Sequence, residues 1–351
     1  MYCWGANSHG QLGLGFCSEM CENPQQVESL PFDPRQIAAI SAGGGHTLIA
    51  LATTGDVYCS GWNHRGQLGL GHCEDVCRFT LVGKYGFSSI ACGWDVSGAI
   101  TMERDVYLWG SNVWHQVGDR CEKYLLVPTK LALPNGTKAK KVCFGLRHTC
   151  ILTEAGKLLL LGKSKWLQKE DIQPSVHGGV EFYELGFTEP ITNVASGENH
   201  LVIQLGQRRI VCVGDNKFGQ CPKESELNRP QCQLVKQLES GWSHSGYLTS
   251  DGRVYLWGRN NYRQLGVATE RSDGIEPVLL DVESKVEKFC LGSQHGLALA
   301  VDGLYAWGWN EHGNCGTGGV ENVTSPTSVE GIVNIREIAT GAGFCLALKK
   351  M

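Results

Sequence analysis

The sequence predicts an all-β protein, a seven-bladed β-propeller that forms a single domain over residues 1–351. Two motifs alternate along the whole chain. The first starts Trp-Gly-x-Asn, continues to Gly-Gln-Leu-Gly, and occurs seven times, two of them in weakened form. The second, Gly-x-x-His, has five clear copies and two that depart from it. A content of 46 glycines without a Gly-X-Y period also indicates many tight turns, and therefore many short strands.

The motif glycines define the repeat, which returns about every 50 residues. In the Trp-Gly-x-Asn motif the aligned glycines are Gly5, Gly61, Gly110, Gly162, Gly214, Gly258 and Gly308. The clear Gly-x-x-His copies start at Gly43, Gly145, Gly197, Gly241 and Gly292, and the two departures start at Gly93 and Gly341. A unit of this length that contains several strand signals is typical of a propeller blade.

Each unit is expected to contain four short strands. In the first complete unit, residues 37–42, 47–51 and 57–60 are rich in apolar and β-branched residues, and Thr54-Gly55-Asp56 predicts a turn before the third strand. The Asn-x-x-Gly-Gln segment then leads into a short fourth strand. Asp251-Gly252 and Asp302-Gly303 predict the same kind of turn in later units.

The two ends of the chain are expected to share one blade. The sequence starts inside a third strand, at residues 2–5, and stops after a second strand, at residues 345–348. Pairing residues 1–15 with residues 335–348 would complete a blade and leave no open sheet edge at the seam. Six whole blades and this composite blade give seven.

Composition excludes several classes of protein. The formal net charge of −4 and the single short basic cluster, Lys138, Lys140 and Lys141, do not predict direct binding of nucleic acid. No signal peptide and no apolar run of about 18 residues is present, so we expect an intracellular protein without membrane insertion. Many of the 16 cysteines lie in apolar strand patterns, which predicts buried free thiols. Free thiols of this kind indicate a reducing compartment.

No catalytic residues or cofactor are predicted. Gly162-Lys163-Ser164 resembles the end of a phosphate-binding loop, but Lys157 stands where the first glycine is needed and no helix is expected to follow. Cys17-x3-Cys21 and Cys73-x3-Cys77 occupy equivalent places in two successive repeats. A four-thiolate metal site is the alternative there; free thiols are favoured because the spacing is unusual for zinc, and the loops with Cys121 and Cys221 lack the pair.

Function is expected at one end of the blades. Because strands alternate in direction, the Gly-x-x-His and Asn-x-x-Gly-Gln segments share one face, and the Asp-Gly turns lie on the other. Tryptophan and arginine are enriched at binding hot spots. The candidate partner-binding residues on the first face are Trp94, Asp95, Trp114, Arg147, Glu198, Asn199, Trp242, His244, His295, Trp309, Glu311 and His312, with His115 and Trp166 also on this face.

A purely structural interpretation competes for several of these residues. The tryptophans that belong to the strand motif, namely Trp4, Trp109, Trp257 and Trp307, are expected to pack between blades. For each repeated histidine, the favoured interpretation is that it bonds backbone groups at its turn. Trp94, Trp114 and Trp309 break the repeat pattern, and for them packing between blades and contact with a partner are equal alternatives.

The two interleaved motifs resemble those of the regulator of chromosome condensation family over the whole chain. Residues 91–95, 240–244 and 307–316 look closest to a secretion-regulating branch of its guanine nucleotide exchange factors. The resemblance implies a small GTPase as partner, a link to secretion through an exocyst component, and a cytoplasmic location with the nucleus as a second one. The alternative is a non-catalytic adaptor that binds a GTPase or an exocyst-type tether.

This chain departs from the founding member of the family in two respects. The founder carries a protruding β-wedge, whereas residues 111–127 here show no such insertion. The founder also has an acidic residue before the histidine of its third Gly-x-x-His turn, where this chain has Arg147; Asn199 occupies that position in the next turn. Candidates for an acid that disturbs the bound nucleotide are therefore Asp95, Glu198 and Glu311.

Overall fold

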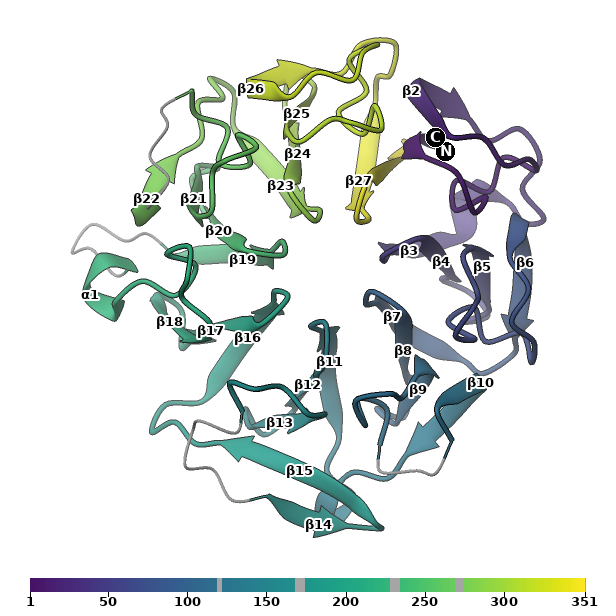
Figure 1. Cartoon of the computed structure of the whole chain (residues 1–351), viewed down its shortest axis with the longest axis vertical. Coiled ribbons are helices and arrows are strands. Elements are labelled where there is room, and N and C mark those ends of the chain that lie inside the picture. The colour runs from purple at the N-terminus through teal and green to yellow at the C-terminus, as the bar shows by residue number, and fades with distance from the viewer. Residues whose placement is uncertain (119–121, 168–173, 228–233, 269–273, 351) are drawn as a thin grey trace. The chain divides into compact units, whose positions relative to one another are not determined.

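The computed structural model describes residues 1–118, 122–167, 174–227, 234–268 and 274–350. These residues form seven antiparallel sheets, the blades of an all-β, seven-bladed propeller (Figure 1). The predicted fold class is confirmed. No helix in these ranges is long and apolar enough to cross a bilayer.

Three sheets follow one another in the first half of the chain. The first contains β3 (Ile37–Ala42), β4 (His46–Leu51), β5 (Val57–Gly61) and β6 (Val76–Gly83). The second contains β7 (Phe87–Cys92), β8 (Val96–Thr101), β9 (Val106–Ser111) and β10 (Tyr124–Leu131). The third contains β11 (Ala139–Phe144), β12 (Thr149–Thr153), β13 (Leu158–Leu161), β15 (Val180–Leu185) and β14 (Ser175–His177), in that spatial order.

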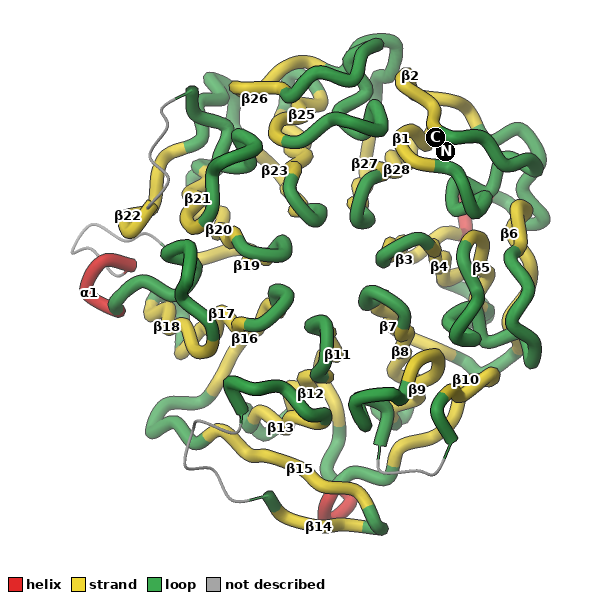
Figure 2. The backbone as a smooth tube through the Cα atoms, in the orientation of Figure 1, coloured by secondary structure: helices red, strands yellow, loops and turns green. Residues whose placement is uncertain are grey.

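Three further sheets follow. The fourth contains β16 (Ile191–Ser196), β17 (His200–Leu205) and β18 (Arg209–Gly214). The fifth contains β19 (Val235–Ser240), β20 (His244–Thr249), β21 (Val254–Gly258) and β22 (Gly274–Leu279). The sixth contains β23 (Val286–Leu291), β24 (His295–Ala300), β25 (Leu304–Gly308) and β26 (Val323–Ser328). Short helices lie at Pro34–Gln36, Pro134–Gly136 and α1 (Glu224–Leu227), and Figure 2 shows the long loops that follow β5 and β25.

The seventh sheet joins the two ends of the chain, as predicted. It contains β2 (Met20–Gln26), β1 (Tyr2–Ala6), β28 (Phe344–Lys349) and β27 (Ile335–Thr340), in that order. In the β1–β28 pair, Tyr2 lies opposite Ala347 and Gly5 opposite Phe344. Both chain ends therefore lie in this blade, as Figure 1 shows.

Two blades differ from the expected four strands. In the third sheet, β14 pairs with β15 to form a hairpin whose turn, Gly178-Gly179, has φ of 59° and 80°. A turn with positive φ at both central residues matches the twist of a hairpin and favours glycine. The fourth sheet has three strands among the described residues, and α1 follows its last strand. No repeat motif marked either feature.

The chain comprises two compact units. One comprises residues 1–8, 18–28 and 195–351, and the other residues 9–17 and 29–194. Second strands of the blades are the most buried elements: every residue of β4, β8, β20 and β24 is buried. A strand covered on both faces needs apolar residues on both sides, which explains runs such as Leu48-Ile49-Ala50-Leu51 in β4.

The strand-motif tryptophans pack between neighbouring blades, as predicted. Trp4, Trp109, Trp257 and Trp307 have no exposed surface. Each donates its indole Nε1–H to a backbone carbonyl in the motif loop of the neighbouring blade: Trp109 to Gln67 at 2.9 Å and Trp307 to Gln264 at 2.9 Å, whereas Trp4 donates to Asn314 at 3.0 Å. A buried indole N–H needs such an acceptor, so the motif links adjacent blades through both apolar contact and hydrogen bonding.

Candidate protein-binding surface

The two motif segments of a blade meet at the same end of its strands. The first residue after the third strand donates its backbone N–H to a carbonyl of the Gly-x-x-His turn: Trp62 to Gly45 at 2.8 Å, and Trp309 to Gln294 at 2.9 Å. Equivalent bonds start from Ser111, Asp215 and Arg259. The predicted sharing of one end by these segments is therefore confirmed within these blades.

Side-chain amides hold the long loops at these ends. The Asn63 Oδ1 atom accepts the backbone N–H of Leu68 at 2.9 Å, and its Nδ2 group donates to the carbonyls of His72 and Glu74 at 2.9 and 3.0 Å. The Gln67 Oε1 atom accepts the N–H of Arg65 at 2.9 Å. Because the buried amides satisfy the loop's own backbone, the residues between them are presented in a defined conformation.

The motif histidines are structural, which corrects two of the candidate assignments. His244 and His295 are fully buried, so their side chains do not belong to a contact surface. Burial lowers the pKa of both imidazoles to about 3. The equivalent His200 is held within the fold, with its Nε2 atom 2.7 Å from the Ser245 hydroxyl, and the Nε2 atom of His295 lies 3.3 Å from the Cys345 thiol. Repetition of this residue marked its packing role.

Trp94 and Asp95 lie on the turn between β7 and β8, partly exposed. The Trp94 indole packs over Gly44, where an added Cβ would lie 2.9 Å from the ring, and the Trp94 carbonyl accepts the Gly44 N–H at 3.2 Å. Burial raises the pKa of the Asp95 carboxyl, while a hydrogen bond from Ser111 and the charge of Arg65 act in the opposite direction. The structure thus brings an acid and a cation together beside an aromatic ring.

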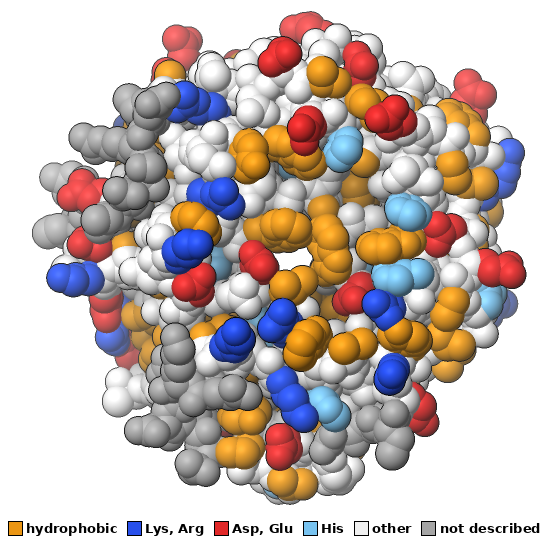
Figure 3. Space-filling model, viewed as in Figure 1, with side chains coloured by type: hydrophobic (Ala, Val, Ile, Leu, Met, Phe, Trp, Pro, Cys, Tyr) orange, Lys and Arg blue, Asp and Glu red, His pale blue; other side chains and the backbone are white. Residues whose placement is uncertain are grey.

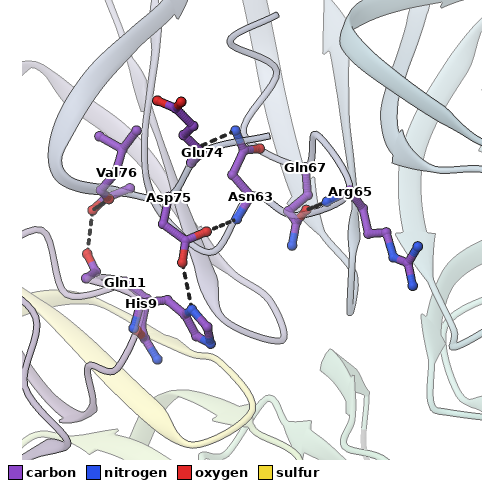
Figure 4. Close-up of polar contacts among 10 residues, drawn as sticks. His9, Gln11, Asn63, Arg65, Gln67, Glu74, Asp75 and Val76 are labelled. Atoms are coloured by element: carbon purple, nitrogen blue, oxygen red, sulfur yellow. Dashed lines mark hydrogen bonds and ion pairs between the residues drawn. The ribbon is translucent and has the colours of Figure 1, made fainter. Parts of the chain in front are cut away.

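A stack of aromatic rings near β5 was missed by sequence reasoning. The Trp62 ring lies between those of His9 and His64, with centroid distances of 4.9 and 3.9 Å. Asp75 connects the two loops: its carboxylate bonds His9 Nδ1 at 2.7 Å and the Asn63 backbone N–H at 2.8 Å (Figure 4). Figure 3 shows histidine, hydrophobic and acidic side chains gathered over β3 to β5. Trp62 directly follows its motif glycine, as Trp309 does. This shared position is a sequence signal that could have identified Trp62 as a surface candidate.

Trp114 and Arg147 form a cation–π pair. The Arg147 guanidinium carbon lies 4.1 Å from the centre of the Trp114 ring, and Trp114 is 36% exposed. His115 follows with a positive φ of 58°. Trp166, also expected on this face, is instead 6% exposed and packs edge-on against His148. Arg147 therefore contributes a cation held on an exposed aromatic ring.

In the other unit, consecutive Gly-x-x-His turns are linked through their outer residues. The Glu198 backbone N–H donates to the Trp242 carbonyl at 3.0 Å, and the Trp242 N–H donates to the Ser293 carbonyl at 3.1 Å. The Asn199 carbonyl accepts the N–H of Asp215 at 2.9 Å. The side chains of Glu198, Asn199 and Trp242 are partly exposed at these turns.

Trp309, Glu311 and His312 form a compact group after β25. The Trp309 indole N–H donates to the Glu311 carboxylate at 3.1 Å, and the His312 ring meets the Trp309 ring edge-on with centroids 5.1 Å apart. Gly343 lies underneath, where an added Cβ would lie 3.1 Å from His312 and 3.3 Å from Trp309. The three predicted residues are thus brought together, with the acid fixed by the indole.

The cysteine pairs show no sign of a metal centre within the described part of the chain. Cys17 and Cys73 are exposed, and Cys21 and Cys77 are partly exposed. Among the described residues no group of three His, Cys, Asp or Glu side chains is arranged to hold a metal ion. Cys121 lies outside those residues. Free thiols without a metal remain a prediction.

Propeller blades with these two motifs define a class of repeat proteins, and residues 1–347 match the RCC1-like domain. The chain belongs to the RCC1-like domain family.

Its relatives include exchange factors and a photoreceptor. The secretion-regulating guanine nucleotide exchange factor of Mus musculus is 31% identical, covering 99% of this chain and 83% of that protein, and the Bos taurus protein of the same name is 30% identical, covering 99% and 82%. The ultraviolet-B receptor UVR8 of Arabidopsis thaliana is 29% identical over 94% of this chain and 77% of that protein.

Solved structures share the fold. Prp20p from Saccharomyces cerevisiae, whose binding properties to Gsp1p and histones have been described, superposes with a TM-score of 0.84 at 22% identity, covering 99% of this chain and 90% of that one. Human WBSCR16 superposes with a TM-score of 0.82 at 21% identity, covering 99% and 98%.

Proposed function

We propose that this protein is a guanine nucleotide exchange factor, or another regulator, of a small GTPase with a role in secretion. The observation that supports this most is the similarity to two secretion-regulating guanine nucleotide exchange factors, which extends over 99% of this chain. The resemblance of the motifs points to the same activity. We propose that the surface that contacts the GTPase lies at the Gly-x-x-His ends of the blades.

Exchange requires a group that disturbs the phosphate or Mg²⁺ site of the GTPase, and an acid near the phosphate-binding lysine is the usual means. Asp95 suits this role best, because it is partly exposed and burial raises the pKa of its carboxyl. A desolvated carboxylate gains more from a new cationic partner than a fully hydrated one does. Glu198 and Glu311 are the other candidates, and Glu311 is already bonded to Trp309.

Contacts that hold the GTPase are assigned to the aromatic and cationic residues of the same ends. Trp114 with Arg147, and Trp309 with His312, offer large rings in defined positions. Trp94 and Trp242 add partly exposed indoles on the turns. Anchors of this kind supply most of the binding free energy at protein interfaces.

The activity is tested by timing the release of a fluorescent GDP analogue from a panel of purified small GTPases. Wild-type protein should accelerate release from at least one of them, and Asp95→Asn should reduce that acceleration at least about tenfold. Glu198→Gln and Glu311→Gln test the other two acids. Asp251→Asn and Asp302→Asn, on the opposite face, are the matched controls.

Affinity capture from cell extract, with and without added nucleotide, identifies the GTPase. Recovery of a nucleotide-free GTPase that is lost when GTP or GDP is added supports exchange. Capture of a GTPase without any acceleration of release by the wild-type protein would replace the exchange factor with the adaptor.

An exocyst component as a second partner, and a cytoplasmic location with the nucleus as a second site, are proposed on the resemblance alone. Co-precipitation of exocyst subunits and fractionation of cells that express the tagged protein test both. Absence of every exocyst subunit from the precipitate would remove that partner.

A further inference from the structure

Two loops of neighbouring blades bring cations and aromatic rings together at a place that sequence reasoning did not single out. Phe218 lies on the loop after β18, and Arg259 and Tyr262 lie on the loop after β21. The Arg259 guanidinium carbon lies 4.5 Å from the centre of the Phe218 ring and 5.6 Å from that of Tyr262. Lys217 Nζ lies 5.2 Å from the Phe218 ring centre. We call these four residues the Arg259 cluster.

Neither cation of the Arg259 cluster forms an ion pair within the described part of the chain. Some cations elsewhere do: Lys157 lies 2.7 Å from Glu184, and Arg209 lies 2.5 Å from Glu224. The nearest acid in sequence, Asp215, is bonded by the Gln220 amide at 3.4 Å. Figure 3 shows Lys and Arg side chains together with hydrophobic and acidic ones over β17 to β21. Among the residues that the structure describes, the cluster therefore presents two cations that no ion pair neutralises.

The loops that carry the cluster are held in place. The Gln220 Oε1 atom accepts the Phe218 N–H at 2.7 Å, and the Gln264 Oε1 atom accepts the Tyr262 N–H at 2.8 Å. Gln264 is held in turn by the buried Gln294 amide, with a nitrogen–oxygen distance of 2.5 Å. Arg259 itself is fixed at its backbone by the Ser243 carbonyl at 2.9 Å. Because folding has already ordered these loops, a partner that binds them loses little conformational entropy at the loops.

We propose that the Arg259 cluster binds an acidic peptide segment of a partner protein. A guanidinium that lies over aromatic rings keeps its N–H edges available for carboxylates, and the rings hold it in position. Lys217 adds a second charge at the side, and Phe218 and Tyr262 offer apolar surface to side chains between the acids. This site is independent of the proposed exchange activity, which depends on Asp95, Glu198 or Glu311.

Fluorescence anisotropy with a fluorescein-labelled octaglutamate peptide and the full chain tests the proposal. Wild-type protein should bind the peptide, and binding should weaken as salt is raised, because the contacts are between exposed charges. The double variant Lys217→Gln/Arg259→Gln should weaken binding about tenfold. Phe218→Leu and Tyr262→Leu retain the charges and should weaken binding to a smaller degree, since they remove the rings that position the guanidinium.

A matched control removes the same charge from cations that are already paired. Lys157→Gln/Arg209→Gln should leave peptide binding within about twofold of wild type, because those cations are engaged by Glu184 and Glu224. An equal loss in this control, unchanged binding by the cluster variant, or no binding of octaglutamate by the wild type would each overturn the proposal. Tighter binding of a labelled octathymidylate than of octaglutamate would overturn it in favour of nucleic acid. Circular dichroism of each variant shows whether it is folded.

Discussion

At the scale of single residues, two tryptophans that are neighbours in the motif have different roles. Trp307 is fully buried at the end of β25 and donates its indole N–H to Gln264. Gly308 follows with φ of 97° and turns the chain, so Trp309 emerges partly exposed at the end of the blade. A tryptophan therefore holds adjacent blades together at position 307, whereas a second tryptophan, two residues later, is partly exposed to solvent.

Truncating each tryptophan to alanine should distinguish the packing role of Trp307 from the binding role of Trp309. Trp307→Ala should lower the free energy of unfolding by about 3–5 kcal/mol, because it leaves a cavity and an unpaired carbonyl. Trp309→Ala should change stability little but weaken partner capture by about 2 kcal/mol or more. Urea unfolding and a pull-down on each variant measure both quantities.

The same comparison extends to Trp94→Ala, Asp95→Ala and Arg147→Ala, which should behave like Trp309→Ala. Asp251→Ala and Asp302→Ala on the opposite face serve as controls. Loss of capture from the controls alone, or equal loss from both sets, would refute the placement of the partner surface.

Buried histidines should make stability depend on pH. Burial lowers the pKa of His46, His244 and His295 to about 3 and that of His200 to about 4, whereas in the unfolded chain each has an ordinary pKa near 6.5. Between these values the unfolded state binds the extra protons, so stability is present above pH 6.5 and is lost as the pH falls toward 3–4. Each histidine should cost about 1 kcal/mol at pH 5.5 relative to pH 7.5.

Urea unfolding at the two pH values measures this loss. His200→Asn should reduce the difference between the two pH values, whereas His177→Asn, at a partly exposed position in β14, should leave it close to wild type. An unchanged difference in the His200 variant would mean that other groups cause the pH dependence.

At the scale of elements, the loops depend on buried amides more than on their exposed residues. Asn63 is fully buried, and its side-chain amide forms three hydrogen bonds to backbone groups of Leu68, His72 and Glu74. The same loop positions Asp75, which holds His9 against the Trp62 ring. Removing one amide should therefore disturb a surface several residues away.

Asn63→Ala should lower the free energy of unfolding by about 1–3 kcal/mol, because buried backbone groups lose their partners. Hydrogen exchange should rise in residues 68–75. Asn63→Asp keeps an acceptor for the Leu68 N–H and should protect that amide, while exchange still rises in residues 72–75. Protection of the whole loop in the alanine variant would contradict this role of Asn63.

At the scale of the whole molecule, we propose that residues 1–351 form one cooperative domain. The composite blade supports this, because β1 pairs with β28 on one side and β2 on the other. Deleting residues 1–15 would leave β28 with an open edge and remove the buried Trp4.

The truncated protein should aggregate or lose its cooperative thermal transition. A synthetic peptide of residues 1–15, added during refolding, should partly restore the transition, and a scrambled peptide should not. Calorimetry and size-exclusion chromatography measure these outcomes. A monomer with an unchanged melting temperature after the deletion would disprove the role of the composite blade.

The sequence by itself determined the blade number, the position of the seam and the packing of the motif tryptophans. These features depend on local patterns that repeat about every 50 residues, and repetition makes a packing role visible. The same repetition indicated a packing role for His244 and His295, and their inclusion in the partner surface was wrong, because the fold buries every copy that lies at the start of a second strand.

Only the tertiary structure decided which side chains meet. The His9–Trp62–His64 stack and the Arg259 cluster combine residues from equivalent loops of successive repeats, and the repeat period does not say which of their side chains touch. The added hairpin of β14 and β15 likewise interrupts the repeat. Contacts between neighbouring blades depend on how the loops are held by their buried amides, and a one-dimensional period carries no information about that geometry.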